Sequence, residues 1–196
     1  MLPLSAVAQQ PTSSASIQGD VYLVMTSGDV KRGAGNTVYL IAATGLAKAD
    51  LDMACRAVRE WEAQRAAPGP KSDSGLYHLA QSLRRHGDNL GAYNTEKMLA
   101  SFQQRGDSIR RGVHEAIANH AVTKAPTGVN AHYRFASVRP GSYWLFAETT
   151  LYDRNYHWWA EATVKPGQAA RVDLDNEAVD FGERFCGAGQ RPIPGA

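Results

Sequence analysis

The residues of this chain that could do chemistry are, first of all, its histidines. There are six: His78, His86, His114, His120, His132 and His157. None stands at HExxH or any other metal-binding spacing, and His114 and His120, six residues apart, fall on opposite sides of a helix. No serine occupies the G-x-S-x-G turn that presents a nucleophile. We therefore expect surface or locally bonded histidines, no catalytic residue, no metal and no cofactor.

The short glycine-rich stretch Gly33-Ala34-Gly35 is a second candidate, because such loops can bind phosphate groups. It is too short for a dinucleotide or P-loop fingerprint, and the segment that follows it has the pattern of a strand rather than a helix. We interpret it as an ordinary loop.

Aromatic residues give a third candidate site. Alternation along 156–165 places Trp159 on one face with His157 and Glu161, and the neighbouring segment 142–150 is apolar on both faces. A bare apolar face would be sticky in water, so we expect protein to cover it. The alternative is that Trp159, His157 and Glu161 form a platform for a sugar ring or a partner peptide.

Composition excludes several classes of function. The 196 residues are 43% hydrophobic and 20% charged, with a net charge of +2, which suits a soluble domain and does not favour nucleic acid or an anionic membrane as partner. No apolar run has the length of a membrane span. We expect a monomer with an unknown protein or glycan partner.

The N-terminal segment predicts export. Leu2 to Ala8 is apolar, and Ala6-Val7-Ala8 has the form of a signal-peptidase site before a polar stretch. We interpret residues 1–16 as a signal remnant and disordered segment, and expect a mature start near Gln9 in a periplasmic, cell-surface or secreted protein. A disordered N-terminus without a signal is the alternative.

The expected export also bears on whether the two cysteines of the chain are paired. Cys55 lies on the apolar stripe of a predicted helix, and Cys186 lies in a glycine-rich tail at 181–196. Export makes a Cys55–Cys186 disulfide plausible, and two unlinked thiols are the alternative.

Periodicity indicates two strands, a helical insertion at about 47–122, and four further strands. The strand patterns cover 16–25, 36–43, 129–138, 142–152, 156–165 and 168–179. The first inserted helix shows an apolar stripe from Leu51 to Trp61, with Asp50 as the expected cap and a stop at 68–70. The last inserted helix is expected to open near Asn94-Thr95. We expect one domain over 17–180, because two strands alone cannot form an independent sheet.

The strand segments resemble the carboxypeptidase regulatory-like domain, a transthyretin-like (prealbumin-like) Greek-key sandwich. The likeness rests on Ile17-Gln18-Gly19-Asp20-Val21, on Ala34 to Leu40, on Thr127, and on Val138-Arg139-Pro140-Gly141-Ser142-Tyr143-Trp144-Leu145. Ala131 departs from the family pattern, because a glycine stands at that turn in the family and alanine resists positive φ. Tyr133 and Arg139 are milder departures.

The resemblance implies a transthyretin-like sandwich and covers none of the helical insertion. Together with the periodicity, we expect a mainly β fold with a helical insertion between strands two and three, and the apolar outer face of 142–150 leads us to expect the insertion to pack on an outer sheet face. The resemblance also implies an exported module without catalysis, structural or protein-binding, with carbohydrate binding through outer-face aromatics as the alternative. Two enzyme families share related sandwiches, but the C-terminus does not match that of hydroxyisourate hydrolases, and no Tyr/His set matches intradiol dioxygenases. Fold alone does not fix function.

Overall fold

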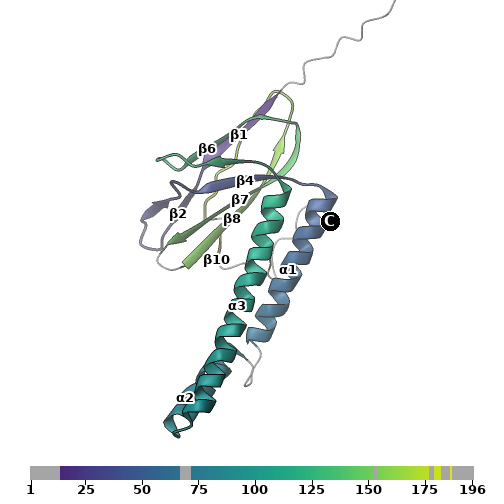
Figure 1. Cartoon of the computed structure of the whole chain (residues 1–196). Coiled ribbons are helices and arrows are strands. Elements are labelled where there is room, and N and C mark those ends of the chain that lie inside the picture. The colour runs from purple at the N-terminus through teal and green to yellow at the C-terminus, as the bar shows by residue number, and fades with distance from the viewer. Residues whose placement is uncertain (1–13, 67–71, 152–153, 177–178, 182–185, 187–196) are drawn as a thin grey trace, which may run out of the picture. The chain divides into compact units, whose positions relative to one another are not determined.

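The computed structural model describes residues 14–66, 72–151, 154–176, 179–181 and 186. Its helices hold more of these residues than its strands do, so the fold is mixed α/β rather than mainly β (Figure 1). Of the segment predicted as signal remnant and disordered at 1–16, residues 1–13 lie outside the described residues, as does most of the predicted tail at 181–196. Ala15 and Ser16 belong to the first strand, so the sandwich begins slightly earlier than predicted.

Three helices form one continuous block of sequence. Helix α1 spans Gly45–Ala66, α2 spans Asp73–Arg85 and α3 spans Asn89–His120. This block agrees with the expected insertion at 47–122. No described helix combines the length and the apolar character that crossing a membrane requires.

Strands precede and follow the helical block. Those before it are β1 (Ala15–Asp20), β2 (Tyr22–Val24), β3 (Val30–Arg32) and β4 (Thr37–Ala42). Those after it are β5 (Ala121–Pro126), β6 (His132–Val138), β7 (Gly141–Leu151), β8 (Arg154–Val164), β9 (Ala169–Arg171) and β10 (Val179–Phe181). The short strands β3, β5 and β10 were not predicted from the sequence. The strand expected over 168–179 is wrong in extent, because β9 ends at Arg171 and, among the described residues, only a single bridge at Leu174 follows it before β10 begins at Val179.

The strands form three sheets. One has the order β6-β1-β9, a second has the order β10-β8-β7-β4-β5, and the pair β2-β3 forms the third. Strand β1 runs antiparallel to β6 and parallel to β9. The segment expected as one strand over 16–25 is two strands, because the chain leaves the first sheet at Val21 and β2 then pairs with β3.

The chain divides into two compact units. The sheet unit comprises the described residues of 1–42, 123–149 and 158–179. The helical unit comprises those of 43–122, 150–157 and 180–196. The chain passes between the units within β5, β7, β8 and β10.

The boundaries of α1 follow from local hydrogen bonding. Thr44 Oγ1 accepts a hydrogen bond from the backbone N–H of Ala47 at 3.2 Å, so Thr44 supplies the cap at the start of the helix. The prediction that Asp50 caps this helix is therefore wrong. Asp50 lies inside the helix, where its carboxylate is 2.7 Å from His120 Nε2 of α3.

Helix α3 begins earlier than the sequence pattern predicted. The Asp88 side chain accepts a hydrogen bond from the N–H of Gly91, and Thr95 lies inside the helix with its hydroxyl donating to the carbonyl of Gly91 at 2.9 Å. An aspartate cap shortly before a leucine is a start signal, but the apolar stripe used for the prediction begins only further along. Helices α1 and α3 run side by side, and α2 packs on the first, N-terminal part of α3 (Figure 1).

Candidate functional site

The aromatic residues that the sequence singled out form one cluster in the sheet unit. In the antiparallel pair β4–β7, Tyr39 lies opposite Phe146 and their ring centroids are 6.2 Å apart. Trp159 of β8 has its ring centroid 5.8 Å from that of Trp144 and 6.0 Å from that of Phe146. Distances of this size between tilted rings are typical of favourable aromatic packing.

The opposite face of the same strands is also apolar. Leu145 and Ala147 of β7 lie opposite Leu40 and Val38 of β4, and all four side chains are buried. Trp158 is buried as well, and its indole donates to the carbonyl of Tyr22 at 3.3 Å. The two-faced apolar character predicted for 142–150 is therefore present.

The expected ligand platform is not one continuous surface. Trp159 is half-buried and Glu161 is exposed, whereas the side chain of His157 is only 2% exposed. Trp144 and Phe146 are buried too. A sugar ring could contact Trp159 and Glu161 directly, but it could not stack on His157.

A second cluster joins the three strands of the β6-β1-β9 sheet. The carboxylate of Asp20 lies 2.9 Å from His132 Nδ1 and accepts a hydrogen bond from Arg171 Nη2 at 2.7 Å. Arg171 also pairs with Asp173, whose carboxylate accepts the backbone N–H of Asp20 at 3.0 Å. We name Asp20, His132, Arg171 and Asp173 the polar array.

The polar array lowers the pKa of Asp20. The hydrogen bond from His132, assisted by Arg171, keeps the pKa of Asp20 below its usual value. Burial raises the pKa of the neighbouring Tyr133, whose hydroxyl donates to the carbonyl of Val172. A paired carboxylate and a neutral phenol are poorly suited to proton transfer near neutral pH, so the array acts chiefly as a link between strands.

The disulfide predicted from the sequence is present in the helical unit. Cys55 of α1 is bonded to Cys186, with their Cα atoms 4.7 Å apart. Arg59, one turn further along α1, donates to the carbonyl of Cys186 at 2.8 Å. Two contacts therefore fix this point of the C-terminal segment to α1.

Three of the remaining histidines have specific neighbours. His86 Nδ1 lies 2.8 Å from the carbonyl of Ser82, and the ring of His78 packs edge-on against Tyr77. His120 pairs with Asp50 over a sequence separation of 70 residues, which spacing alone could not reveal.

His114 and His157 meet inside the helical unit. Their ring centroids are 5.9 Å apart. No sequence motif signals this pair, because one residue lies on a helix and the other on a strand that follows much later.

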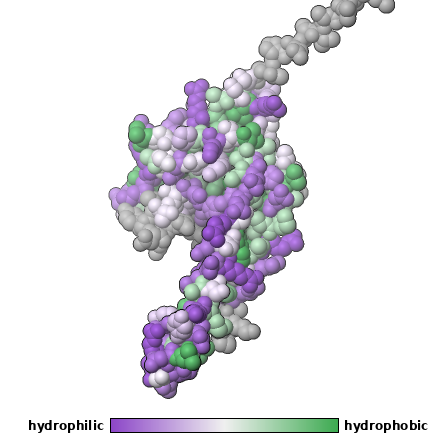
Figure 2. Space-filling view, viewed as in Figure 1, coloured by the Kyte–Doolittle hydropathy of each residue, from purple (hydrophilic) through white to green (hydrophobic). Residues whose placement is uncertain are grey.

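The helical unit exposes large apolar side chains on the α2–α3 hairpin. We name this set the hairpin surface; its members are Tyr77, Leu79, Leu90, Tyr93 and Met98. Tyr77 and Leu79, two residues apart, lie on opposite sides of α2, so the set is not one continuous patch. Leu90 is 71% and Tyr93 52% exposed, on the side of α3 opposite the buried Ala92 and Thr95. Figure 2 shows hydrophobic atoms among hydrophilic ones at the end of this hairpin.

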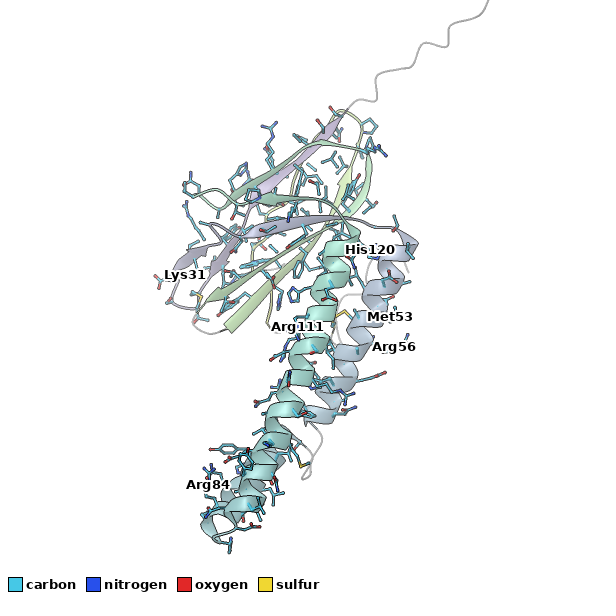
Figure 3. All side chains as sticks on the ribbon, viewed as in Figure 1. Lys31, Met53, Arg56, Arg84, Arg111 and His120 are labelled. Atoms are coloured by element: carbon cyan, nitrogen blue, oxygen red, sulfur yellow. A yellow bond between two sulfur atoms is a disulfide. The ribbon has the colours of Figure 1, made fainter. Side chains whose placement is uncertain are left out.

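Helix α1 also carries an exposed apolar residue. Met53 is exposed, and Figure 3 shows Met53 and Arg56 on the side of α1 that faces away from α3. Leu79 and Met98 lie on apolar stripes of the sequence at 76–83 and 98–117, where burial was expected, so their exposure shows that this expectation was wrong. The other exposed residues lie outside these stripes, which carry no information about the outer faces of helices.

No family model and no curated protein matches the chain. Among solved structures, it is similar to a protein from Pseudomonas aeruginosa for which carbohydrate binding has been suggested, with 18% identity, a TM-score of 0.42, and coverage of 86% of this chain and 92% of that one. It is also similar to the pilus backbone protein RrgB from Streptococcus pneumoniae, with 10% identity, a TM-score of 0.28, and coverage of 82% and 41%. These values are too low to support a functional argument, which therefore depends on the residues of this chain.

Proposed function

We propose that this chain is an exported, non-catalytic protein-interaction module, in which a transthyretin-like sandwich carries a helical insertion that binds a partner. The observation that carries the proposal is the exposure of the hairpin surface on α2 and α3. The disulfide between Cys55 and Cys186 supports export, because such bonds persist in oxidising compartments.

Two of the residues that carry the sequence resemblance make contacts that explain their types, and these contacts support the proposed sandwich. A Cβ at Gly19 would overlap the backbone carbonyl of Val172, so glycine is needed where β1 meets the segment after β9. Thr127 accepts the N–H of Asn36 at 2.8 Å and donates to the carbonyl of Gly33, which holds the loop before β4. Both positions belong to the pattern of the carboxypeptidase regulatory-like domain.

The hairpin surface has the composition of a binding interface. Its tyrosines and methionine are types enriched at interface centres. Charged groups lie on the same helices: the ammonium of Lys97 lies 4.7 Å from the centroid of the Tyr93 ring, and Arg84 pairs with Glu96 at 2.6 Å. Exposed apolar side chains on helices that also carry charged residues fit a non-obligate interface, which is about as apolar as the rest of a protein surface.

Carbohydrate binding is the second candidate, and Trp159 and Glu161 favour it. A half-exposed indole beside an exposed carboxylate can stack on a sugar ring and accept its hydroxyl groups. The burial of His157, Trp144 and Phe146 limits this contact to a small area. Quenching of tryptophan fluorescence by a glycan panel, abolished in Trp159→Ala, would favour it over protein binding.

Affinity purification from the native host tests the protein-interaction proposal. We expect specific co-purifying proteins with the wild-type chain and their loss in Leu90→Lys/Tyr93→Lys. The matched control is Val122→Lys/Val129→Lys, which places the same charges at exposed apolar positions outside the hairpin. Retention of the same proteins by the Leu90/Tyr93 variant would contradict the proposal.

A further inference from the structure

Two imidazoles lie together in the helical unit, contributed by elements far apart in the sequence. His114 belongs to α3 and His157 to the first part of β8. Their ring centroids are 5.9 Å apart, the planes make an angle of 55°, and each ring offers a nitrogen within 4.8 Å of the other.

The backbone around both histidines is held in place. His114 lies between Val113 and Ile117, which are both on the buried face of α3. His157 follows the buried Tyr156 and is itself almost fully buried. The two rings are therefore presented by fixed elements, while the half-buried His114 leaves one side accessible to ions from solvent.

The chemistry of such a pair favours a transition metal. Two nitrogens bound to one tetrahedral Zn²⁺ are about 3.4 Å apart, because each Zn–N bond is about 2.1 Å long. The ligand nitrogens of the pair lie within 4.8 Å of each other, so the proposal requires a small rotation of the half-buried His114 ring when the metal binds. Imidazole suits Zn²⁺ and Cu²⁺, whereas Ca²⁺ and Mg²⁺ prefer oxygen ligands.

We propose that His114 and His157 form a two-histidine site for a divalent transition metal, Zn²⁺ or Cu²⁺, whose other positions are taken by water or other ligands. The two imidazoles bind in their neutral forms, so affinity falls as pH is lowered through the range in which histidine protonates. The site is independent of the proposed protein contact, because neither histidine belongs to the hairpin surface.

Titration calorimetry with ZnCl₂ and CuCl₂ tests the site on the untagged full chain after removal of metal by a chelator. We expect one ion per chain, tighter binding of Cu²⁺ than of Zn²⁺, and an increased Tm when either metal is added. Electron paramagnetic resonance of the Cu²⁺ form should show hyperfine splitting from two nitrogens. Absence of binding, or a Cu²⁺ spectrum with oxygen ligands alone, would overturn the proposal.

Matched histidine variants locate the site. His114→Gln and His157→Gln are each expected to weaken binding by at least about tenfold, since a ligand is lost. His78→Gln and His86→Gln, which remove histidines of α2 and its C-terminal cap, are expected to leave affinity unchanged. Circular dichroism confirms folding, and if the buried His157 variant does not fold, the half-buried His114 variant decides. Unchanged affinity in folded His114→Gln, or loss in a control, would overturn the proposal.

Discussion

Gly106 of α3 lies directly against the indole of Trp61 on α1: a Cβ at this glycine would overlap Cζ2 of the ring. The other surfaces of Trp61 are also occupied. Phe102 has its ring centroid 6.0 Å away, and the guanidinium carbons of Arg110 and Arg65 lie 4.8 and 5.4 Å from the indole centroid. The absence of a side chain at Gly106 therefore allows α1 and α3 to approach closely.

Two glycine substitutions in α3 are expected to act in opposite directions. Gly106→Ala should lower the free energy of unfolding by about 1–3 kcal/mol, because overpacking against Trp61 exceeds the gain in helix propensity. Gly112→Ala should raise it by about 0.5–1 kcal/mol, since no atom lies within 4 Å of the position that the new Cβ would occupy. Urea denaturation measures both. A stabilised Gly106→Ala variant would show that the two helices are not closely packed here.

Ala131 adopts the left-handed conformation that the family pattern brought into question. Its φ is +63°, and its carbonyl accepts the N–H of Val21 at 3.0 Å. The turn is therefore retained with alanine in place of glycine.

Ala131→Gly is expected to change stability by less than about 0.5 kcal/mol, because relief of backbone strain offsets the lost buried methyl group and the added chain entropy. Ala147→Gly, at a buried strand position, should cost about 1.5 kcal/mol, because no strain is relieved there. Thermal unfolding of the two variants compares them. Equal losses would show that Ala131 carries no strain.

Reduction of the Cys55–Cys186 bond should destabilise the chain substantially. The two residues are 131 positions apart, and the chain-entropy model assigns a loop of this length at most about 5 kcal/mol. We expect a loss of about 2–5 kcal/mol for the reduced protein and for Cys55→Ser/Cys186→Ser. Urea midpoints with and without dithiothreitol provide the measurement, and non-reducing peptide mapping checks the linkage. Identical midpoints would mean that the bond does not stabilise the folded state.

The polar array predicts a dependence of stability on acid pH. The folded-state pKa of Asp20 is lowered, so its contribution is fully present above the unfolded value near 3.8 and is lost as pH falls through the lower folded value. The difference in unfolding free energy between wild type and Asp20→Asn should therefore be largest above about pH 5 and shrink toward about pH 2. Asp29→Asn, which removes a surface carboxylate bonded to Ser27, is the control. A difference that grows on acidification would contradict the assignment.

Local patterns were sufficient to predict the helices and most strands. The stripe from Leu51 through Cys55 and Val58 to Trp61 is buried as expected, because a helix has a fixed period that the sequence displays. Helix starts were predicted less well: the cap at Thr44 and the cap at Asp88 are single side-chain contacts that do not alter the apolar period.

Contacts between distant segments could not be predicted from pattern alone. His132 lies on β6 and Asp20 on β1, and their meeting depends on the register that pairs these two residues directly. His114 and His157 likewise meet only because of tertiary packing. The disulfide was predicted because only two cysteines were available and export favours their pairing, whereas six histidines allow many combinations.

The central claim is that the hairpin surface binds a protein partner, and site-specific photo-crosslinking in the native host tests it most directly. A photoreactive phenylalanine analogue at Leu90 is expected to give discrete higher-mass adducts, weakened when Tyr93→Lys is added. The same analogue at Val129, which is 90% exposed in the sheet unit, should give none of these adducts. Adducts at Val129 with none at Leu90 would contradict the claim and assign the contact to the sheet unit instead.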